Sequence, residues 1–136
     1  MSILFGTDEW VKALMVELNN SPGYASAAKK WEGDFYFVIN QGDGMAEETY
    51  LYMDLWHGKC RDAFKVDDAG AKSPAFELRA PIKTWKSVVG KKTDPIRGLM
   101  TGKLKMKGPM VKVMKTPKAA IELVEACSRL DTDWPS

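Results

Sequence analysis

Few side chains in this sequence could act as nucleophiles, acids or bases. His57 is the single histidine, and Cys60 follows three residues later. A catalytic nucleophile needs a base that a third group orients, and proximity at a tight turn does not supply that orientation. Asp54 and Asp62 fall in successive predicted strands, but nothing in the sequence places them in one cleft, and a histidine with one cysteine makes a weak metal site. We therefore predict that the protein is not an enzyme and that it holds no metal and no cofactor.

Residues 94–114 are the most informative stretch, because apolar side chains and lysines follow one another in a regular order. Asp94-Pro95 predicts a helix start, since aspartate caps free N–H groups and proline fits the first turn. Gly102 would end this helix in a left-handed turn. The expected apolar face of the helix carries Ile96, Leu99 and Met100.

The lysines that follow alternate with apolar residues. Between Lys103 and Lys107, Leu104 and Met106 occupy the intervening positions, which predicts a strand with one apolar and one cationic face. Gly108-Pro109 then starts a further helical turn. The stretch therefore combines an apolar lining with a cationic rim.

The remaining sequence predicts helices at both ends and strands between them. Residues 35–39 are apolar on both faces, so the sheet must be covered on both sides or must line a ligand. The pattern indicates an α+β fold in one domain, residues 1–136. The expected helices lie near 11–18, 21–31, 81–90, 94–101 and 116–130, and the expected strands at 35–39, 48–56, 59–66, 75–80 and 103–107.

The stretch 94–114 resembles the signature of the sterol carrier protein type 2 (SCP-2) domain family. That signature is an Asp-Pro helix, a Gly-Lys-Leu-Lys step, a glycine and a short amphipathic helix. It is matched here by Asp94, Pro95, Gly102, Lys103, Leu104, Lys105 and Gly108. The likeness in length and element order extends over residues 5–131. It implies a five-stranded, mostly antiparallel sheet that is covered by helices and encloses an apolar tunnel.

The resemblance implies a noncovalent carrier that binds and transfers or presents lipids. The ligand classes are fatty acyl chains, fatty acyl-CoA, phospholipids and sterol-like molecules. An alternative is an accessory subunit that delivers a lipid or isoprenoid substrate to a partner enzyme. Several of the eight methionines fall in the signature stretch, where flexible side chains suit an adaptable wall. The residues expected to line the tunnel are Phe35, Phe37, Met53, Trp85, Leu99, Met100, Leu104, Met106, Met110, Met114, Ile121, Val124 and Leu130.

Charge is strongly polarised along the chain. Residues 79–118 contain twelve Lys or Arg and one acid, a net charge of +11, whereas the other residues carry eight basic and seventeen acidic groups, a net −9. A basic region beside a lipid-binding wall predicts contact with an anionic membrane or with a phosphate or carboxylate headgroup. A simpler interpretation is a solvated face whose lysines protect a sheet edge. The expected rim residues are Arg97, Lys103, Lys105, Lys107 and Lys112.

The same basic segment leaves nucleic-acid binding open as a distant alternative. Twelve cations could contact phosphates and Trp85 could stack on a base, but no recognised nucleic-acid motif is present. The modest overall charge of +2 also argues against that class of protein.

The cysteines and the apolar stretches of the sequence indicate the cellular compartment of the protein. Cys60 and Cys127 are far apart and lack a paired spacing, so a disulfide framework is not expected. The sequence contains neither a basic, apolar leader nor a stretch long enough to span a bilayer. We therefore expect a cytoplasmic protein.

Overall fold

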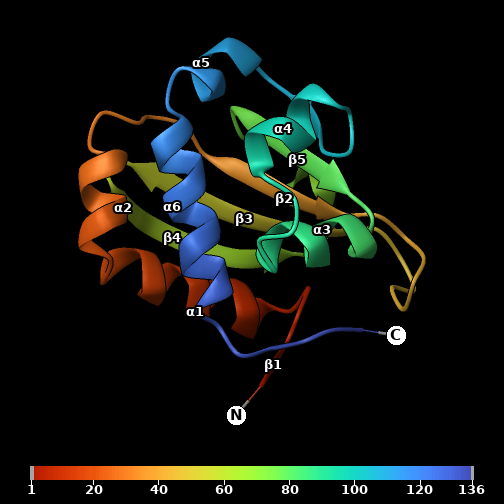
Figure 1. Ribbon diagram of the computed structural model, residues 1–136. Helices are drawn as coiled ribbons and strands as arrows, with labels where there is room; N and C mark the ends of the chain where they lie inside the picture. The colour runs from red at the N-terminus through yellow and green to blue at the C-terminus, as the bar shows by residue number, and fades with distance from the viewer. Residues whose placement is uncertain (1, 136) are drawn as a thin grey trace.

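The protein is described by a computed structural model that covers residues 2–135 (Figure 1). Its helices alternate with the strands of one main sheet. In chain order the elements are β1 (Ile3–Leu4), α1 (Asp8–Asn19), α2 (Pro22–Ala27), β2 (Phe35–Ile39), β3 (Thr49–Trp56), β4 (Lys59–Val66), the 3₁₀ turn η1 (Ala69–Ala71), β5 (Phe76–Ala80), α3 (Ile82–Val89), α4 (Pro95–Met100), β6 (Lys105–Lys107), α5 (Met110–Met114), α6 (Pro117–Ser128) and β7 (Thr132–Asp133).

The main sheet has five strands in the order β4-β3-β2-β5-β6. Phe35 of β2 is paired with Met53 in the antiparallel neighbour β3 and with Phe76 in the parallel neighbour β5. The other two pairings, β3 with β4 and β5 with β6, are antiparallel. The predicted α+β fold with a mostly antiparallel five-stranded sheet is therefore confirmed.

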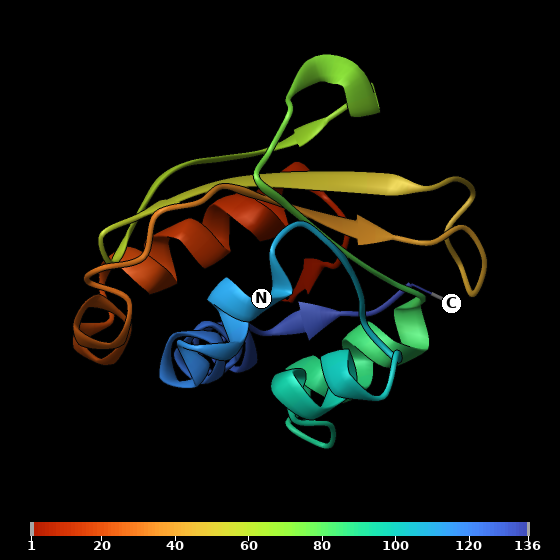
Figure 2. The ribbon, with the colours of Figure 1, turned by 90° about the horizontal axis from the view of Figure 1, so that it is seen from above.

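The helices lie on one face of the sheet, which we call the inner face (Figure 2). Helix α1 packs across β3 and β4, and α6 contacts α1, α2, α3 and α4. Each amphipathic helix buries its apolar stripe toward the sheet, as its period predicts. The main core therefore lies between the inner face and this helical layer.

The outer face of the sheet forms a second, smaller core without a helical cover. Tyr36, Val38, Tyr52 and Val66 are buried there, and Tyr50 and Phe64 pack against them. The Tyr36 hydroxyl fixes the η1 loop over this cluster, because it accepts from the Lys72 N–H at 2.9 Å and donates to the Ala69 carbonyl at 3.0 Å. On the outer face, aromatic rings and the η1 loop therefore provide the cover that the apolar strand β2 requires.

Strands β1 and β7 form a separate parallel pair that the sequence does not predict. Ile3 is paired with Thr132, and the Trp10 indole N–H donates to the Thr132 hydroxyl at 3.0 Å. Two-residue strands are too short to show a period, so only their contact reveals them. Among residues 2–135, no helix is long and apolar enough to cross a bilayer.

The signature stretch largely follows its local signals. The Asp94 carboxylate accepts from the N–H groups of Ile96 and Arg97 at 2.8 and 3.1 Å, and Gly102 has a φ of +78° just after α4. The strand is shorter than predicted, since β6 begins at Lys105 and not at Lys103. The Leu104 N–H donates instead to the Gly98 carbonyl at 3.0 Å, which holds residues 103 and 104 against α4.

Gly108 is the glycine whose replacement should cost most in this stretch. Its φ is +118°, and a Cβ there would lie 2.6 Å from the Ala75 carbonyl oxygen. We expect Gly108→Ala to lower the free energy of unfolding by about 2–3 kcal/mol, through backbone strain and a clash with β5. Gly102→Ala is the matched control, because its Cβ would meet no atom within 4 Å, and it should cost about 1 kcal/mol. Urea denaturation measures both; equal losses would contradict the clash.

Candidate functional site

An apolar cavity lies between the inner face of the sheet and the helical layer, in which α3 to α6 supply most of the lining and α1 and α2 one residue each. Its volume is about 80 Å³, and nearly all of its lining is apolar. The sheet contributes Phe35, Phe37, Leu55, Leu78 and Met106. The helices and their flanking turns contribute Trp10, Tyr24, Trp31, Trp85, Val88, Val89, Pro95, Leu99, Leu104, Val113, Thr116, Ala119, Ala120, Leu123, Val124 and Cys127.

The cavity is smaller than an acyl chain needs. A cavity of roughly 150 Å³ holds a single benzene molecule, and the present volume of about 80 Å³ is close to half of that. Apolar cavities of this kind stay dry, because water finds no polar partner in them. A long ligand can therefore enter only if part of the wall moves outward.

The cavity comes closest to solvent between α4, β6 and α6. Among its lining residues, those that are only partly buried include Pro95, Met106, Thr116, Ala120 and Val124. Helix α5 lies at this end of the molecule, above α6 in Figure 1. We call this end the mouth of the cavity.

Seven of the predicted lining residues are brought together around the cavity. They come from β2, the middle of α3, α4, the region around β6, and α6. These residues are Phe35, Phe37, Trp85, Leu99, Leu104, Met106 and Val124.

Three other predicted lining residues lie elsewhere because of the elements that carry them. Met53 is fully buried on β3, but α1 covers this part of the inner face, so Met53 belongs to the solid core. Met100 is the last residue of α4 and is 72% exposed. Ile121 lies on the solvent flank of α6, beside the cavity-facing stripe of Ala120 and Val124.

The last three lie beyond the cavity. Met110, in the first turn of α5, is exposed, and Met114 at the end of α5 packs on the core without lining the cavity. Leu130 follows the end of α6 and lines a separate shallow cleft that also contains Trp134. Periodicity assigns residues to a face, but it does not reveal where a short helix ends relative to its neighbours.

Several lining residues were not expected. Helical spacing indicates only that a helix face is buried, and it does not distinguish the cavity from the solid core. This applies to Trp10, Tyr24, Trp31 and Val89. A signal for the cavity does exist in α6, where the consecutive Ala119 and Ala120 leave room opposite the large aromatic rings of the sheet. Small side chains at packed positions are the pattern that could have located the cavity.

A protein-family model decides which family this fold and cavity represent: the model of the SCP-2 sterol transfer family matches residues 12–120. The chain belongs to the SCP-2 sterol transfer family. The resemblance inferred from residues 94–114 is thereby confirmed.

Solved structures agree with the family assignment. A crystal structure of sterol carrier protein 2 is 31% identical, with a TM-score of 0.85 over 93% of this chain and 98% of that chain. A conserved hypothetical protein from Thermus thermophilus, described as possibly a sterol carrier protein, is 29% identical, with a TM-score of 0.86 over 98% of this chain and 94% of that one. The UbiJ-SCP2 ubiquinone synthesis protein shares the fold at 15% identity, with a TM-score of 0.55 over 84% of this chain and 86% of that chain. No curated protein matches the sequence.

The residues considered for catalysis lie outside the cavity of this SCP-2 domain. The His57 imidazole Nε2 lies 2.6 Å from the Glu32 carboxylate, and the ring stacks on Trp56. The Cys60 thiol donates to the Asp62 carbonyl at 3.3 Å, and burial raises the pKa of this thiol to about 12. Such a thiol is protonated at neutral pH and is a poor nucleophile.

The two carboxylates considered as paired acids are register partners across β3 and β4. Asp54 nevertheless accepts two hydrogen bonds from the Arg61 guanidinium, each of 3.1 Å, and neither Asp54 nor Asp62 lines the cavity. Within residues 2–135, no three His, Cys, Asp or Glu side chains are grouped as a metal site.

The predicted rim residues are all exposed, but the structure divides them between two faces. Arg97, Lys103 and Lys112 are carried by α4, the turn after it, and α5, at the mouth. Lys105 and Lys107 alternate with Met106, which faces the cavity, so they lie on the outer face of the sheet. They are the first and last residues of the edge strand β6 and suit its protection from pairing with other chains.

Trp85 is not free to stack on a base. It is buried, and its indole N–H donates to the Val38 carbonyl at 3.1 Å. The nucleic-acid alternative therefore loses the aromatic contact on which it depended.

The polar groups of the aromatic lining are tied to the backbone or to a neighbouring side chain, with one exception. The indole N–H groups of Trp10, Trp31 and Trp85 each donate to an oxygen at 3.0–3.1 Å. The Tyr24 side chain is only 2% exposed, and no described residue forms a hydrogen bond with its hydroxyl. Burial raises the pKa of this phenol, so it is a neutral donor at physiological pH.

Replacing Tyr24 by Phe should leave the free energy of unfolding nearly unchanged, because its hydroxyl forms no hydrogen bond with a described residue and its oxygen is not fully buried. Tyr36→Phe is the matched control, and it should cost about 1–3 kcal/mol because the Lys72 N–H and the Ala69 carbonyl lose their partner. Thermal and urea unfolding measure both variants. A loss for Tyr24→Phe as large as that for Tyr36→Phe would show that the Tyr24 hydroxyl is paired.

Cys127 provides a chemical probe of the cavity wall. It is 3% exposed, and burial raises the pKa of its thiol to about 12. Only the thiolate is alkylated, so modification by iodoacetamide should be very slow at pH 8 and should rise about tenfold per pH unit up to pH 10. Peptide mass spectrometry after timed quenching measures the rate. Modification within minutes at pH 8 would contradict a closed cavity.

Proposed function

We propose that this SCP-2 domain is a carrier that binds the acyl or isoprenoid chain of a lipid in the cavity and releases it reversibly. The observation that carries the proposal is the continuous apolar lining, from Phe35 and Phe37 on the sheet to Val124 on α6. Membership of the SCP-2 family supports lipid binding and transfer. The ligand classes we propose are fatty acids, acyl-CoA, phospholipids and sterol-like molecules.

The free energy gained by burying an acyl chain is large enough for binding with few polar contacts. Burial of a sixteen-carbon chain contributes about 0.8 kcal/mol per methylene, about 13 kcal/mol in total. Association and ordering cost at least ~4 kcal/mol, and outward movement of the wall costs more. The surplus is large enough for useful affinity and gives little selectivity among chain types. The Tyr24 hydroxyl is the one polar group we assign to ligand contact, as a donor to an oxygen of the ligand.

The accessory role is the second candidate, and it uses the same cavity. The UbiJ-SCP2 ubiquinone synthesis protein shares this fold, so we include isoprenoid quinones among the ligands to be tested. Delivery to an enzyme differs from free transfer only in the presence of a stable partner, which copurification from the source cells would reveal.

Displacement of a fluorescent fatty acid by a panel of lipids tests the carrier function. We expect saturable binding by the unmodified protein and at least tenfold weaker binding by Met106→Lys, because an ammonium group at the mouth of an apolar cavity is poorly solvated. Met100→Lys is the matched control: the same substitution at a 72% exposed position outside the cavity should bind normally.

A second variant covers the case in which Met106→Lys fails to fold. Ala120→Leu keeps a good helix former on α6 and fills the cavity from its partly exposed side. It should also weaken binding of long chains. No saturable binding of any lipid class by the unmodified, lipid-extracted protein would rule out the carrier function.

A further inference from the structure

Helix α5 is weakly held over the cavity. It has five residues, of which only Val113 is buried, and Val113 is its one contribution to the cavity lining. Gly108-Pro109 precedes it, and Thr116-Pro117 joins it to α6. A short helix with one buried side chain contributes little packing energy, so α5 is the part of the wall that can move at least cost.

Lys112 makes the polar contact that ties α5 to a distant part of the chain, beside the apolar packing of Val113 and Met114. Its ammonium group lies 5.0 Å from the centre of the Trp31 ring and 5.8 Å from that of Phe76. It also donates to the backbone carbonyl of Glu32. Within residues 2–135, this is the hydrogen bond that links α5 to a distant part of the chain. Because Trp31 lines the cavity, Lys112 acts as a latch between α5 and the cavity wall.

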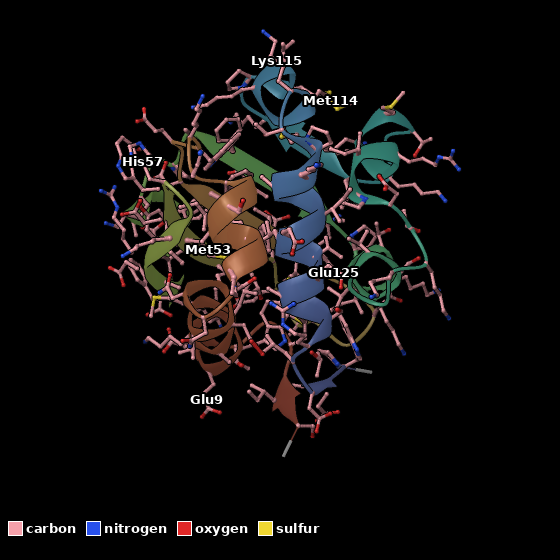
Figure 3. The ribbon with its side chains drawn as sticks, turned by 60° about the vertical axis from the view of Figure 1, so that its left-hand side comes forward. Glu9, Met53, His57, Met114, Lys115 and Glu125 are labelled. Carbon is pink, nitrogen blue, oxygen red and sulfur yellow. The ribbon has the colours of Figure 1, made fainter. Side chains whose placement is uncertain are left out.

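The surface around this latch has the composition of a membrane-binding face. Residues 97–118 carry seven Lys or Arg and no acid. Five of the seven are exposed on the mouth side, and none of the five forms an ion pair with a described residue: Arg97, Lys103, Lys112, Lys115 and Lys118. Figure 3 shows Lys115 at the tip of the molecule, at the opposite end from Glu9.

Exposed apolar side chains accompany these cations. Met100 at the end of α4 is 72% exposed, Val111 of α5 is 65% exposed, and Met110 next to it is also exposed. Figure 1 places α4 and α5 at the same end of the molecule. Cations mixed with protruding apolar side chains match a bilayer interface, where lipid phosphates meet acyl chains. A nucleic acid would gain nothing from the apolar side chains, and no aromatic ring is exposed among these residues for a base to stack on.

We propose that an anionic bilayer binds this face and opens the cavity, because lipid phosphates draw Lys112 away from Trp31, Phe76 and the Glu32 carbonyl. An ammonium–phosphate hydrogen bond is charge-assisted and replaces contacts that are individually weak. Helix α5 then moves outward with Val113, and the ligand passes between the cavity and the membrane. The inference rests on the proposed carrier function, since it identifies the surface with which the ligand is exchanged.

The test is alkylation of Cys127, which lines the cavity, compared with alkylation of Cys60, which is buried outside it. The rate at each thiol is read by peptide mass spectrometry, with no lipid present other than the vesicles. Vesicles of phosphatidylcholine containing one third phosphatidylglycerol should accelerate modification of Cys127 at least fivefold and leave Cys60 unchanged. Vesicles of pure phosphatidylcholine should accelerate neither.

Two matched variants separate the latch from general charge. Lys112→Met should accelerate Cys127 modification about fivefold without vesicles, the equivalent of the ~1 kcal/mol of one exposed cation–π contact. Lys115→Met removes the same charge from the same helical segment without breaking the latch, so it should leave that rate unchanged. Each variant should bind anionic vesicles about fivefold more weakly, the effect expected for one lysine near the surface.

Three results would overturn the inference. The first is a Lys112→Met rate equal to that of the unmodified protein, and the second is vesicle binding that leaves Cys127 protected. The third is acceleration by a single-stranded oligonucleotide and not by vesicles, which would assign the face to nucleic acid. Because the alkylation rate reports opening of the cavity and the displacement assay reports binding, a protein that opens on vesicles but binds no lipid in that assay would refute the carrier function alone.

Discussion

The parallel pairing of β5 with β2 is the contact on which the cavity depends. It places Phe76 beside Phe35 and Leu78 beside Phe37, and β6 then adds Met106 next to Leu78. The signature stretch, which is remote from β2 in sequence, thereby becomes a wall opposite the aromatic rings of the sheet. Helix α1 covers β3 and β4 closely, so the inner face is packed solid on one side and is left open beneath α3, α4 and α6 on the other.

The cavity persists because the surrounding side chains cannot fill it. Hydrogen bonds fix the indole rings of Trp10, Trp31 and Trp85, and rotation of any of them would leave a buried N–H without a partner. Opposite these rings, α6 presents the small side chains of Ala119 and Ala120. Well-packed cores close such voids, since each lost contact costs dispersion energy. An unfilled apolar volume bounded by fixed rings is better explained by a ligand than by stability.

Local signals predicted the elements well and the cavity only in part. The Asp94 cap, the left-handed Gly102 and the alternation around Met106 each depend on neighbouring residues, and the structure contains all three. Met100 and Ile121 share apolar character with the lining residues, but their exposure depends on where α4 ends and on what lies beside α6. The lining by Trp10 and Tyr24, and the pairing of β1 with β7, depend on contacts between distant segments. No period in the sequence reports such contacts.

The mouth of the cavity is surrounded by positively charged side chains. Edge protection accounts for Lys105 and Lys107, which lie on the outer face beside Met106. It does not account for Lys115 and Lys118, which lie at the mouth, at the end of α5 and the start of α6. Like charges so close together destabilise the folded state, and a single glutamate among them would relieve the repulsion. Residues 97–118 contain no acid, and five of their seven cations lie at the mouth of the cavity. Contact with an anionic surface, as proposed above, would relieve the repulsion among these cations.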